Sequence, residues 1–151
     1  MKPAIQLACF AILLFASCKQ KDQRIIDKER KVTGLPAGDA KFLALKDTAQ
    51  KYIGEFINSL EENGSNDNYE FNIKSNYSDN GINEHMWAKP FLYKNNVFSC
   101  VFIDSAFEVK NVITGDTVFI NKNDVEDWVI YNFSDSTKMG YFSEKYLSGK
   151  D

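Results

Sequence analysis

An apolar stripe along residues 39–64 constrains the fold more than any other feature of this sequence. In DAKFLALKDTAQKYIGEFINSLEENG, apolar residues recur at the spacing that places them on one face of an α-helix. Asp39 is positioned to cap the N-terminus of this helix and Gly64 to end it. The stripe consists of Phe42, Leu45, Ala49, Tyr52 or Ile53, Phe56 or Ile57, and Leu60. A stripe of this length must pack on an apolar surface formed elsewhere in the chain.

The segments after the helix have the lengths and patterns of short strands. YEFNIKSNY, residues 69–77, alternates apolar and polar side chains, whereas VFSCVFI, residues 97–103, is nearly continuous in apolar residues and indicates a central strand. EHMWAKP, TVFIN, WVIYNF and GYF are further strand-like runs, separated by turn sequences such as SDNG and ITGD. The order predicts the α+β class, with one long N-terminal helix packed on a strongly bent antiparallel sheet or partly closed barrel.

The chain's only histidine, His85, lies in the predicted strand EHMWAKP, residues 84–90. Neighbouring side chains of a strand face opposite ways, so Glu84 points away from the imidazole and cannot easily orient it. A metal site would need further ligands of the right type, and the sequence has no second histidine. We therefore expect His85 to serve the architecture, and we expect no metal and no cofactor.

Some residue pairs could in principle act as catalytic groups, but they form no recognisable catalytic motif. Cys100 could act as a nucleophile with His85 as its base, although a thiol in so apolar a strand is more often inert packing. Paired carboxylates, Glu84 with Asp127 or Glu126 with Asp127, could act as acid and base. The sequence contains no Gly-rich phosphate loop, no G-x-S-x-G and no H-E-x-x-H. We expect no enzyme; the alternative is a small hydrolase or transferase using His85 with Asp127 or Cys100.

The N-terminus has the pattern of an export signal. Lys2 precedes an apolar run from Ala4 to Phe15 that is interrupted only by Gln6. The run is shorter than the roughly 20 apolar residues of a transmembrane helix, and it fits the core of a secretory signal. It ends in FASC, which resembles the lipobox of bacterial lipoproteins. The resemblance implies removal of residues 1–17, a thioether lipid on Cys18, and acylation of the new N-terminus, which together give stable membrane attachment.

Charge separates a tether from a folded domain. Residues 18–38 predict a flexible tether, in which six Lys and Arg outnumber three acids. Removing Lys2 and these six cations from 18 leaves 11, and removing three acids from 21 leaves 18, so residues 39–151 carry about −7. A domain this acidic is a poor candidate for binding nucleic acid. Its one cysteine, Cys100, has no partner for a disulfide within the domain.

The two tryptophans occur in similar contexts, EHMW and EDW. Tryptophan buries a large area while its N–H seeks a partner, so both can belong to the core. The alternative is a partly exposed aromatic surface that docks a protein, glycan or peptide. If a binding surface exists, we expect it to comprise Glu84, His85, Trp87, Asp127 and Trp128, with the tryptophans as contacts and Asp127 as a polar anchor.

Several short motifs follow one another in a recognisable order. They are the helix opened by Asp39, EHMW at 84–87, Gly-Asp at 115–116, an apolar-x-Asp-Trp step at 125–128, and a Gly-aromatic stretch at 140–143. In this order they resemble the YegJ-like family, domain of unknown function 2314. The resemblance implies an α+β domain over residues 39–151 and brings no established activity, substrate or cofactor.

The sequence also departs from the pattern of that family. Cys100 stands where the family tends to have glycine, Asp104 and Ala106 replace its Asn and Pro, and Lys145 replaces a usual arginine. A ligand surface shaped by these positions would be altered in this chain.

Together these features predict a lipid-anchored protein of the bacterial cell envelope, placed at the outer membrane, with a small non-catalytic binding domain and a protein partner. A purely structural envelope component is a further alternative.

Overall fold

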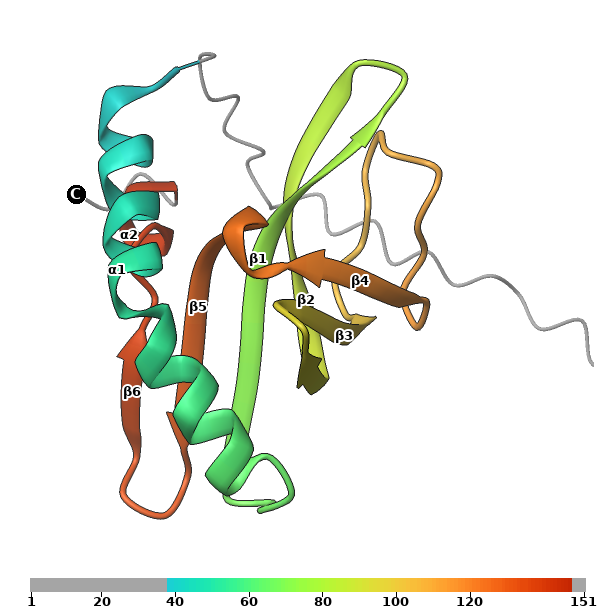
Figure 1. Ribbon diagram of the computed structural model, residues 1–151. Helices are drawn as coiled ribbons and strands as arrows, with labels where there is room; N and C mark the ends of the chain where they lie inside the picture. Colours follow the sequence, from blue (N-terminus) through green and yellow to red (C-terminus); the bar gives the residue numbers. More distant parts are fainter. Residues whose placement is uncertain (1–37, 148–151) are drawn as a thin grey trace, which may run out of the picture. The chain divides into compact units, whose positions relative to one another are not determined.

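The computed structural model describes residues 38–147. The predicted signal peptide, Cys18 and nearly all of the predicted tether therefore lie outside the described residues. The elements, in chain order, are α1 (Ala40–Asn63), β1 (Tyr69–Asp79), β2 (Ile82–Lys94), β3 (Val97–Phe102), β4 (Thr117–Asn121), the 3-10 turn η1 (Lys122–Asp124), β5 (Val125–Asn132), β6 (Thr137–Gly140) and α2 (Glu144–Leu147). This is the predicted α+β fold, and the sheet is not closed (Figure 1).

Helix α1 begins and ends as predicted. The Asp39 Oδ1 accepts a hydrogen bond from the Phe42 N–H at 2.8 Å, which satisfies a donor in the first turn. At the other end the Gly64 N–H donates to the Leu60 carbonyl at 2.8 Å. The buried face consists of Phe42, Ala49, Ile53, Phe56 and Leu60. These residues belong to the predicted stripe, so the period of the sequence identified the packing face.

The six strands form one antiparallel sheet in the order β4-β3-β2-β1-β5-β6. Strand β1 is central and is shared between two neighbours: its first half pairs with β5 and its second half with β2. The β1–β2 hairpin turns at Asn80 and Gly81, which both have positive φ angles, 50° and 83°. Two consecutive left-handed residues are typical of the turn that matches the twist of a two-residue hairpin.

Two bulges bend the sheet. The pairing of β1 with β5 shifts between Lys74 and Ser75, which leaves Glu126 as the extra residue on β5. A second shift, between Pro90 and Leu92, leaves Phe91 as the extra residue on β2. The strong bend predicted from the strand spacing therefore has a local cause. Within residues 38–147, no strand pairs with the β5 side of β1 beyond Ser75.

The core lies between α1 and the concave face of the sheet, with Trp128 near its centre. The Trp128 indole packs 5.5 Å from the Phe56 ring, and its Nε1–H donates to the Ala49 carbonyl at 3.0 Å. Phe98 and Cys100 of β3 complete this cluster. A smaller cluster joins Val109 and Val112 of the segment 103–116 to Met86 and Phe102 of the sheet.

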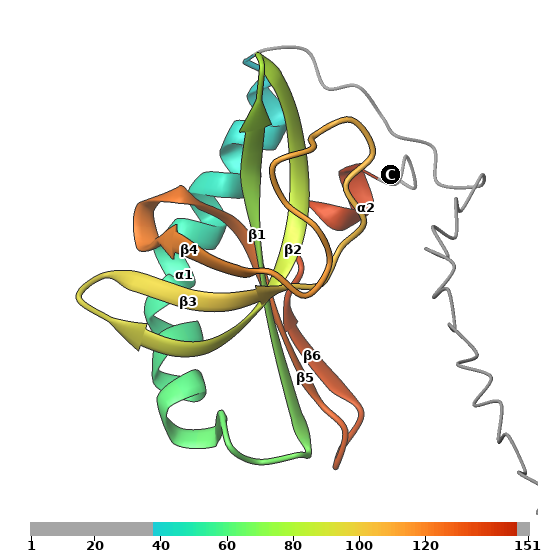
Figure 2. The same ribbon diagram turned by 90° about the vertical axis from the view of Figure 1, so that its right-hand side faces the viewer.

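Segment 103–116 is a long loop beside the β1–β2 hairpin (Figure 2). None of its residues belongs to a helix or strand. The predicted GYF strand differs from the structure, because β6 ends at Gly140 and Tyr141 has a φ of 65°, in the left-handed region. Within residues 38–147 no helix is both long and apolar enough to span a lipid bilayer.

Candidate functional site

The structure separates the five residues of the predicted binding surface. Asp127 is fully buried and Trp128 is 1% exposed, so neither can contact a partner in this fold. Trp128 is a core residue, which matches the first interpretation of the tryptophans. Glu84, His85 and Trp87 are half-buried. The predicted surface is therefore reduced to three residues on β2.

Asp127 ties the C-terminal segment to the sheet. Its Oδ1 accepts from the N–H groups of Trp128 and Phe142, at 2.8 and 3.1 Å. Its Oδ2 accepts from the Ser143 N–H at 2.8 Å and from the Ser143 hydroxyl at 2.7 Å. Four donors occupy the carboxylate, which explains how a fully buried charge is tolerated. Asp127 is thus a structural anchor and has no contact with His85 among these bonds.

Glu84 fastens the loop 103–116. Its carboxylate accepts from the backbone N–H groups of Phe107, at 2.9 Å, of Glu108, and of Val109, at 3.4 Å. As the strand alternation predicted, Glu84 does not contact His85. Its role as a clamp on a distant loop has no signal in the sequence, because the loop residues contribute only backbone atoms.

His85 does have an acidic partner, and it comes from another strand. The His85 Nδ1 lies 2.5 Å from the Glu126 Oε2, and Glu126 is 5% exposed. The Glu126 Oε1 lies 3.5 Å from the Lys46 Nζ on α1, and the Phe42 ring packs on the imidazole at 5.0 Å. The β5 bulge places Glu126 where it can reach across β1. The sequence reasoning considered only Glu84 as a partner for the ring, and it did not predict this pair.

Cys100 is separated from His85. Cys100 lies on β3 and pairs with Pro90 of β2. Its side chain is fully buried, and this burial raises the pKa of its thiol to about 12. A thiol in this environment is not a nucleophile at neutral pH. The structure thus gives no support to the alternative in which Cys100 acts with His85.

Trp87 belongs to a cationic and aromatic stack on the other side of the sheet from Trp128. The Lys74 Nζ lies 4.6 Å from the Trp87 ring centre, and the Tyr141 ring stacks on Trp87 at 6.0 Å. The Lys138 Nζ lies 3.8 Å from the Tyr141 ring centre. Lys74 is 4% exposed and its Nζ also bonds the Glu144 Oε2 at 3.0 Å. The contacts of Trp87 are thus largely intramolecular.

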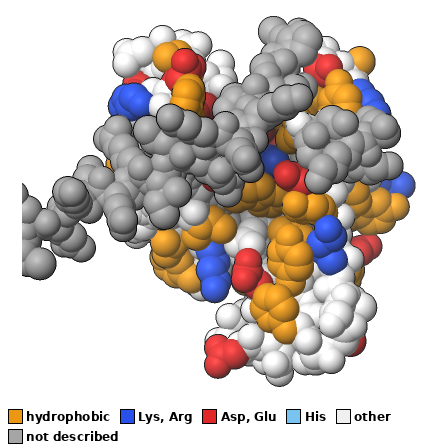
Figure 3. All heavy atoms as spheres, turned by 180° about the vertical axis from the view of Figure 1, so that it is seen from behind, with side chains coloured by type: hydrophobic (Ala, Val, Ile, Leu, Met, Phe, Trp, Pro, Cys, Tyr) orange, Lys and Arg blue, Asp and Glu red, His pale blue; other side chains and the backbone are white. Residues whose placement is uncertain are grey.

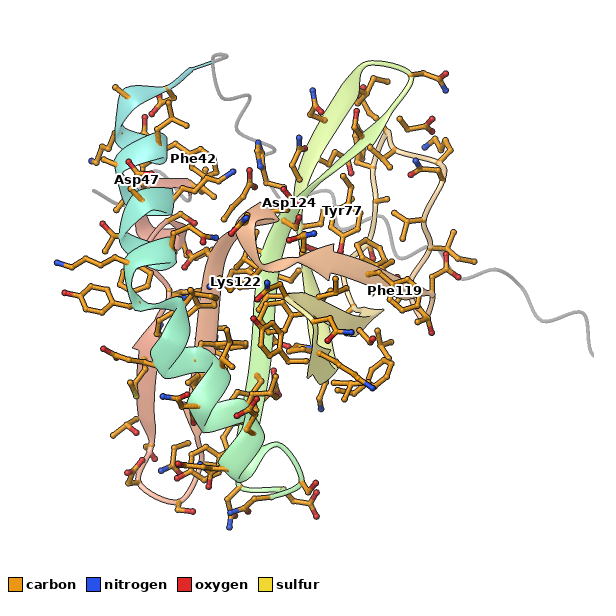
Figure 4. The ribbon with its side chains drawn as sticks, viewed as in Figure 1. Phe42, Asp47, Tyr77, Phe119, Lys122 and Asp124 are labelled. Atoms are coloured by element: carbon orange, nitrogen blue, oxygen red, sulfur yellow. The ribbon has the colours of Figure 1, made fainter. Side chains whose placement is uncertain are left out.

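An open groove of about 420 Å³ lies beside these residues, and we call it the β1–β4 groove. Its walls are Ser75–Ser78 of β1 and Phe119 and Ile120 of β4, with Asp124 and Glu126, Lys46 of α1, and Asn111. In Figure 4, Tyr77, Phe119, Lys122 and Asp124 lie across from α1, which carries Phe42 and Asp47. Near Asp124, the Gln50 Nε2 donates to the carbonyls of Lys122 at 3.0 Å and Val125 at 2.5 Å.

The groove is mostly polar, and its size falls within the range of ligand sites in proteins. The sequence did not predict it, because its walls come from five separate segments. Over residues 38–147 the structure contains no group of three or more His, Cys, Asp or Glu side chains able to hold a metal ion.

Comparison with known proteins gives a family but no activity. Residues 39–149 match the model of a family described as "Uncharacterized protein conserved in bacteria (DUF2314)". The chain is 30% identical over 99 residues to "Uncharacterized protein YegJ" of Escherichia coli (strain K12). That match covers 66% of this chain and 62% of the relative's length. No solved structure matches. The β1–β4 groove and the His85–Glu126 pair both lie inside the matched region.

Proposed function

The chain belongs to the DUF2314 family of conserved bacterial proteins, and from this premise we propose that it is a lipid-anchored envelope protein whose domain binds a partner and catalyses no reaction. In this proposal Cys18 carries the lipid, residues 18–38 are the tether, and the acidic domain acts at the outer membrane. The comparisons bring the family alone, so the binding role rests on the geometry of the domain.

One observation carries the proposal: three of the groups considered for chemistry hold the fold, while a polar groove stays open. Asp127 accepts four hydrogen bonds, Glu84 clamps a loop, and Cys100 is buried with a raised pKa. A catalytic group needs an atom that is not already engaged in the fold and that can reach a substrate. The β1–β4 groove, by contrast, offers polar atoms and exposed apolar surface to a partner.

The anchor has its own support and its own test. FASC at residues 15–18 resembles a lipobox, and several acyl chains would hold the protein firmly. Cells are grown with labelled fatty acid, and the protein and its Cys18→Ala variant are purified. We expect label on the former alone, and an intact mass that shows a mature chain beginning at Cys18. Label that persists in the variant, or an unmodified soluble mature chain, would refute the anchor.

The binding role is tested in living cells by site-specific photo-crosslinking. A benzophenone amino acid replaces Phe119, which lines the groove, or Phe133, an exposed residue that does not line it. We expect a discrete crosslinked product from position 119 and none from position 133. Equal products, or none from either position in the native envelope, would contradict a partner at the groove.

A second candidate is a small hydrolase or transferase that uses His85. The observation in its favour is the 2.5 Å contact between His85 and Glu126, because a carboxylate on Nδ1 leaves Nε2 available as a base. The His85 side chain is 28% exposed, so a substrate could reach it. A turnover on ester, amide or phosphoester substrates that is lost in both His85→Gln and Glu126→Gln would establish this candidate and displace the binding proposal.

A further inference from the structure

Strand β4 forms one edge of the sheet, and within residues 38–147 no strand pairs with its outer side. The Lys122 N–H donates to the Asn96 carbonyl and the Phe102 N–H to the Asp116 carbonyl, both at 2.8 Å. These bonds fix the alternation of the antiparallel pair, so the residues between them that bond β3 are Val118 and Ile120. It follows that the N–H and C=O groups of residues 117, 119 and 121 point away from β3.

The second half of β1 presents another unpaired edge. Odd-numbered residues of β1 bond β2, since Asp79 and Ile82 close the two-residue hairpin. The even-numbered residues therefore point towards β5, and pairing with β5 stops at Ser75. Asn76 and Ser78 remain, and the Ser78 carbonyl accepts from the Asn111 side chain at 3.0 Å. The backbone of Asn76 has no hydrogen bond to that side among the described residues.

The β1–β4 groove lies between these two edges. Ser75–Ser78 line one wall, and both Phe119 and Ile120 line the other. Phe119 and Ile120 are neighbours in a strand and their side chains point to opposite faces, so the part of β4 that borders the groove is its free edge. The groove is thus the unclosed gap in a strongly bent sheet, bordered by strand backbone on both sides.

The two edge strands of the sheet differ in their protection. Edge strands of soluble proteins are commonly guarded by a charge, a proline, a bulge or very short length. Strand β6 has only four residues and includes Lys138. Strand β4, Thr117–Asn121, has no charged residue, no proline and no bulge, and Phe119 is 73% exposed. On the face shown in Figure 3, the visible hydrophobic groups are interspersed with charges. The β4 edge is therefore fit to receive another strand.

The charges around the groove indicate the partner. Asp124 and Glu126 line it against one cation, Lys46, whose Nζ lies 3.5 Å from Glu126. The domain as a whole carries about −7, so a second copy of this chain would be repelled and a cationic segment attracted.

We infer that the free edge of β4 binds an extended peptide segment of a partner protein, rich in Lys or Arg, as an added strand. This inference rests on the proposed binding function and specifies its partner chemistry. Main-chain hydrogen bonds to residues 117, 119 and 121 supply the affinity. Alternate side chains of the peptide pack on Phe119 and place their cations towards Asp124.

The test uses full-length protein purified in detergent and a synthetic peptide that alternates Val with Lys and Thr. Fluorescence anisotropy measures its affinity, and backbone amide shifts in NMR locate it. We expect saturable binding with shifts concentrated at Thr117, Phe119 and Asn121. Phe119→Thr should weaken binding about fivefold, because a central apolar contact is lost, while the matched control Phe133→Thr leaves it unchanged. Asp124→Asn should weaken it two- to fivefold at low salt, with the difference disappearing at high salt.

Two modified peptides separate strand addition from charge attraction alone. Methylation of alternate backbone nitrogens removes donors on one edge and should abolish binding, and replacement of Lys by Glu should do the same. Equal binding of the methylated peptide, or shifts centred away from β4, would overturn the inference. So would a peptide-free dimer that shifts the same three amides, since a second copy would then occupy the edge. A specific crosslink from Phe119 in cells with no peptide binding here would retain the binding function and reject this partner chemistry.

Discussion

Gly140 is the position where a single added methyl group should cost the domain most. It ends β6 with a φ of 79°, in the left-handed region. A Cβ built there would lie 2.5 Å from Trp128 Cε3 and 2.7 Å from Trp128 Cζ3, and closer still to the Trp128 carbonyl oxygen. That oxygen accepts the Tyr141 N–H at 2.8 Å, so it cannot move freely. Gly140→Ala therefore combines a strained backbone with a collision against the core.

The magnitude follows from two separate terms. A non-glycine residue in the left-handed region costs about 1–2 kcal/mol. Overpacking against a buried side chain adds about 1–3 kcal/mol. The sum, roughly 2–5 kcal/mol, is a large part of the 5–15 kcal/mol that a domain of ordinary stability possesses. Gly81 supplies the matched control, because its φ is 83° and a Cβ there would meet nothing within 4 Å. Gly81→Ala should therefore lose only the first term.

Urea denaturation followed by tryptophan fluorescence measures both variants. The difference in unfolding free energy between Gly140→Ala and Gly81→Ala isolates the collision with Trp128, provided that the dependence on urea is unchanged. We expect Gly140→Ala to be less stable than Gly81→Ala by at least about 1 kcal/mol. Equal decreases in unfolding free energy for the two variants would refute the reasoning, because they would mean that the Trp128 indole can move aside at no cost in free energy.

Three further predictions follow from buried or capping groups. Asp127→Asn should lower the unfolding free energy by about 2–4 kcal/mol in the same urea assay, since an amide cannot accept from both Phe142 and Ser143 as the carboxylate does; a change under 1 kcal/mol would show that Asp127 is no anchor. Cys100 should resist iodoacetamide at about pH 8 until urea unfolds the chain, because burial raises its pKa to about 12; rapid alkylation of the native protein, detected by mass spectrometry, would contradict its burial. The hydrogen bond from the Phe42 N–H, followed by that from the Tyr146 hydroxyl, lowers the pKa of Asp39. The Asp39 carboxylate therefore stabilises the fold fully above its unfolded pKa of about 3.9, and this stabilisation is lost as pH falls through the lower folded pKa. Asp39→Asn should flatten that acid loss in pH-dependent melting, and an unchanged acid limb would exclude Asp39 as its source.

The helix and the class of the fold were predictable because they depend on local periodicity. The spacing from Phe42 to Leu60 and the caps at Asp39 and Gly64 are properties of one short segment, and the structure confirms them. The strand series was predictable for the same reason, since alternation and turn residues lie close together in the sequence. The exact ends were less so: β2 extends to Lys94 through Pro90, which a bulge at Phe91 accommodates.

The candidate site was poorly predictable because it depends on the bulge in β5. A bulge is a difference in count between two paired strands, and the sequence of one strand does not show it. Glu126 is the extra residue, and its position decides that His85 has an acidic partner. Asp127 and Trp128 were candidates for a binding surface, although core packing was the first interpretation of the tryptophans. The helix on one side and the C-terminal turn on the other bury both, and that covering depends on tertiary packing.

The hydrogen bond from the Tyr146 hydroxyl to the Asp39 carboxylate, 2.7 Å long, joins the first and last elements of the domain across 107 residues of chain. Asp127 likewise needs Ser143 to complete its shell. Both contacts use residues near the end of the described chain, so the first and last elements of the domain hold each other in place.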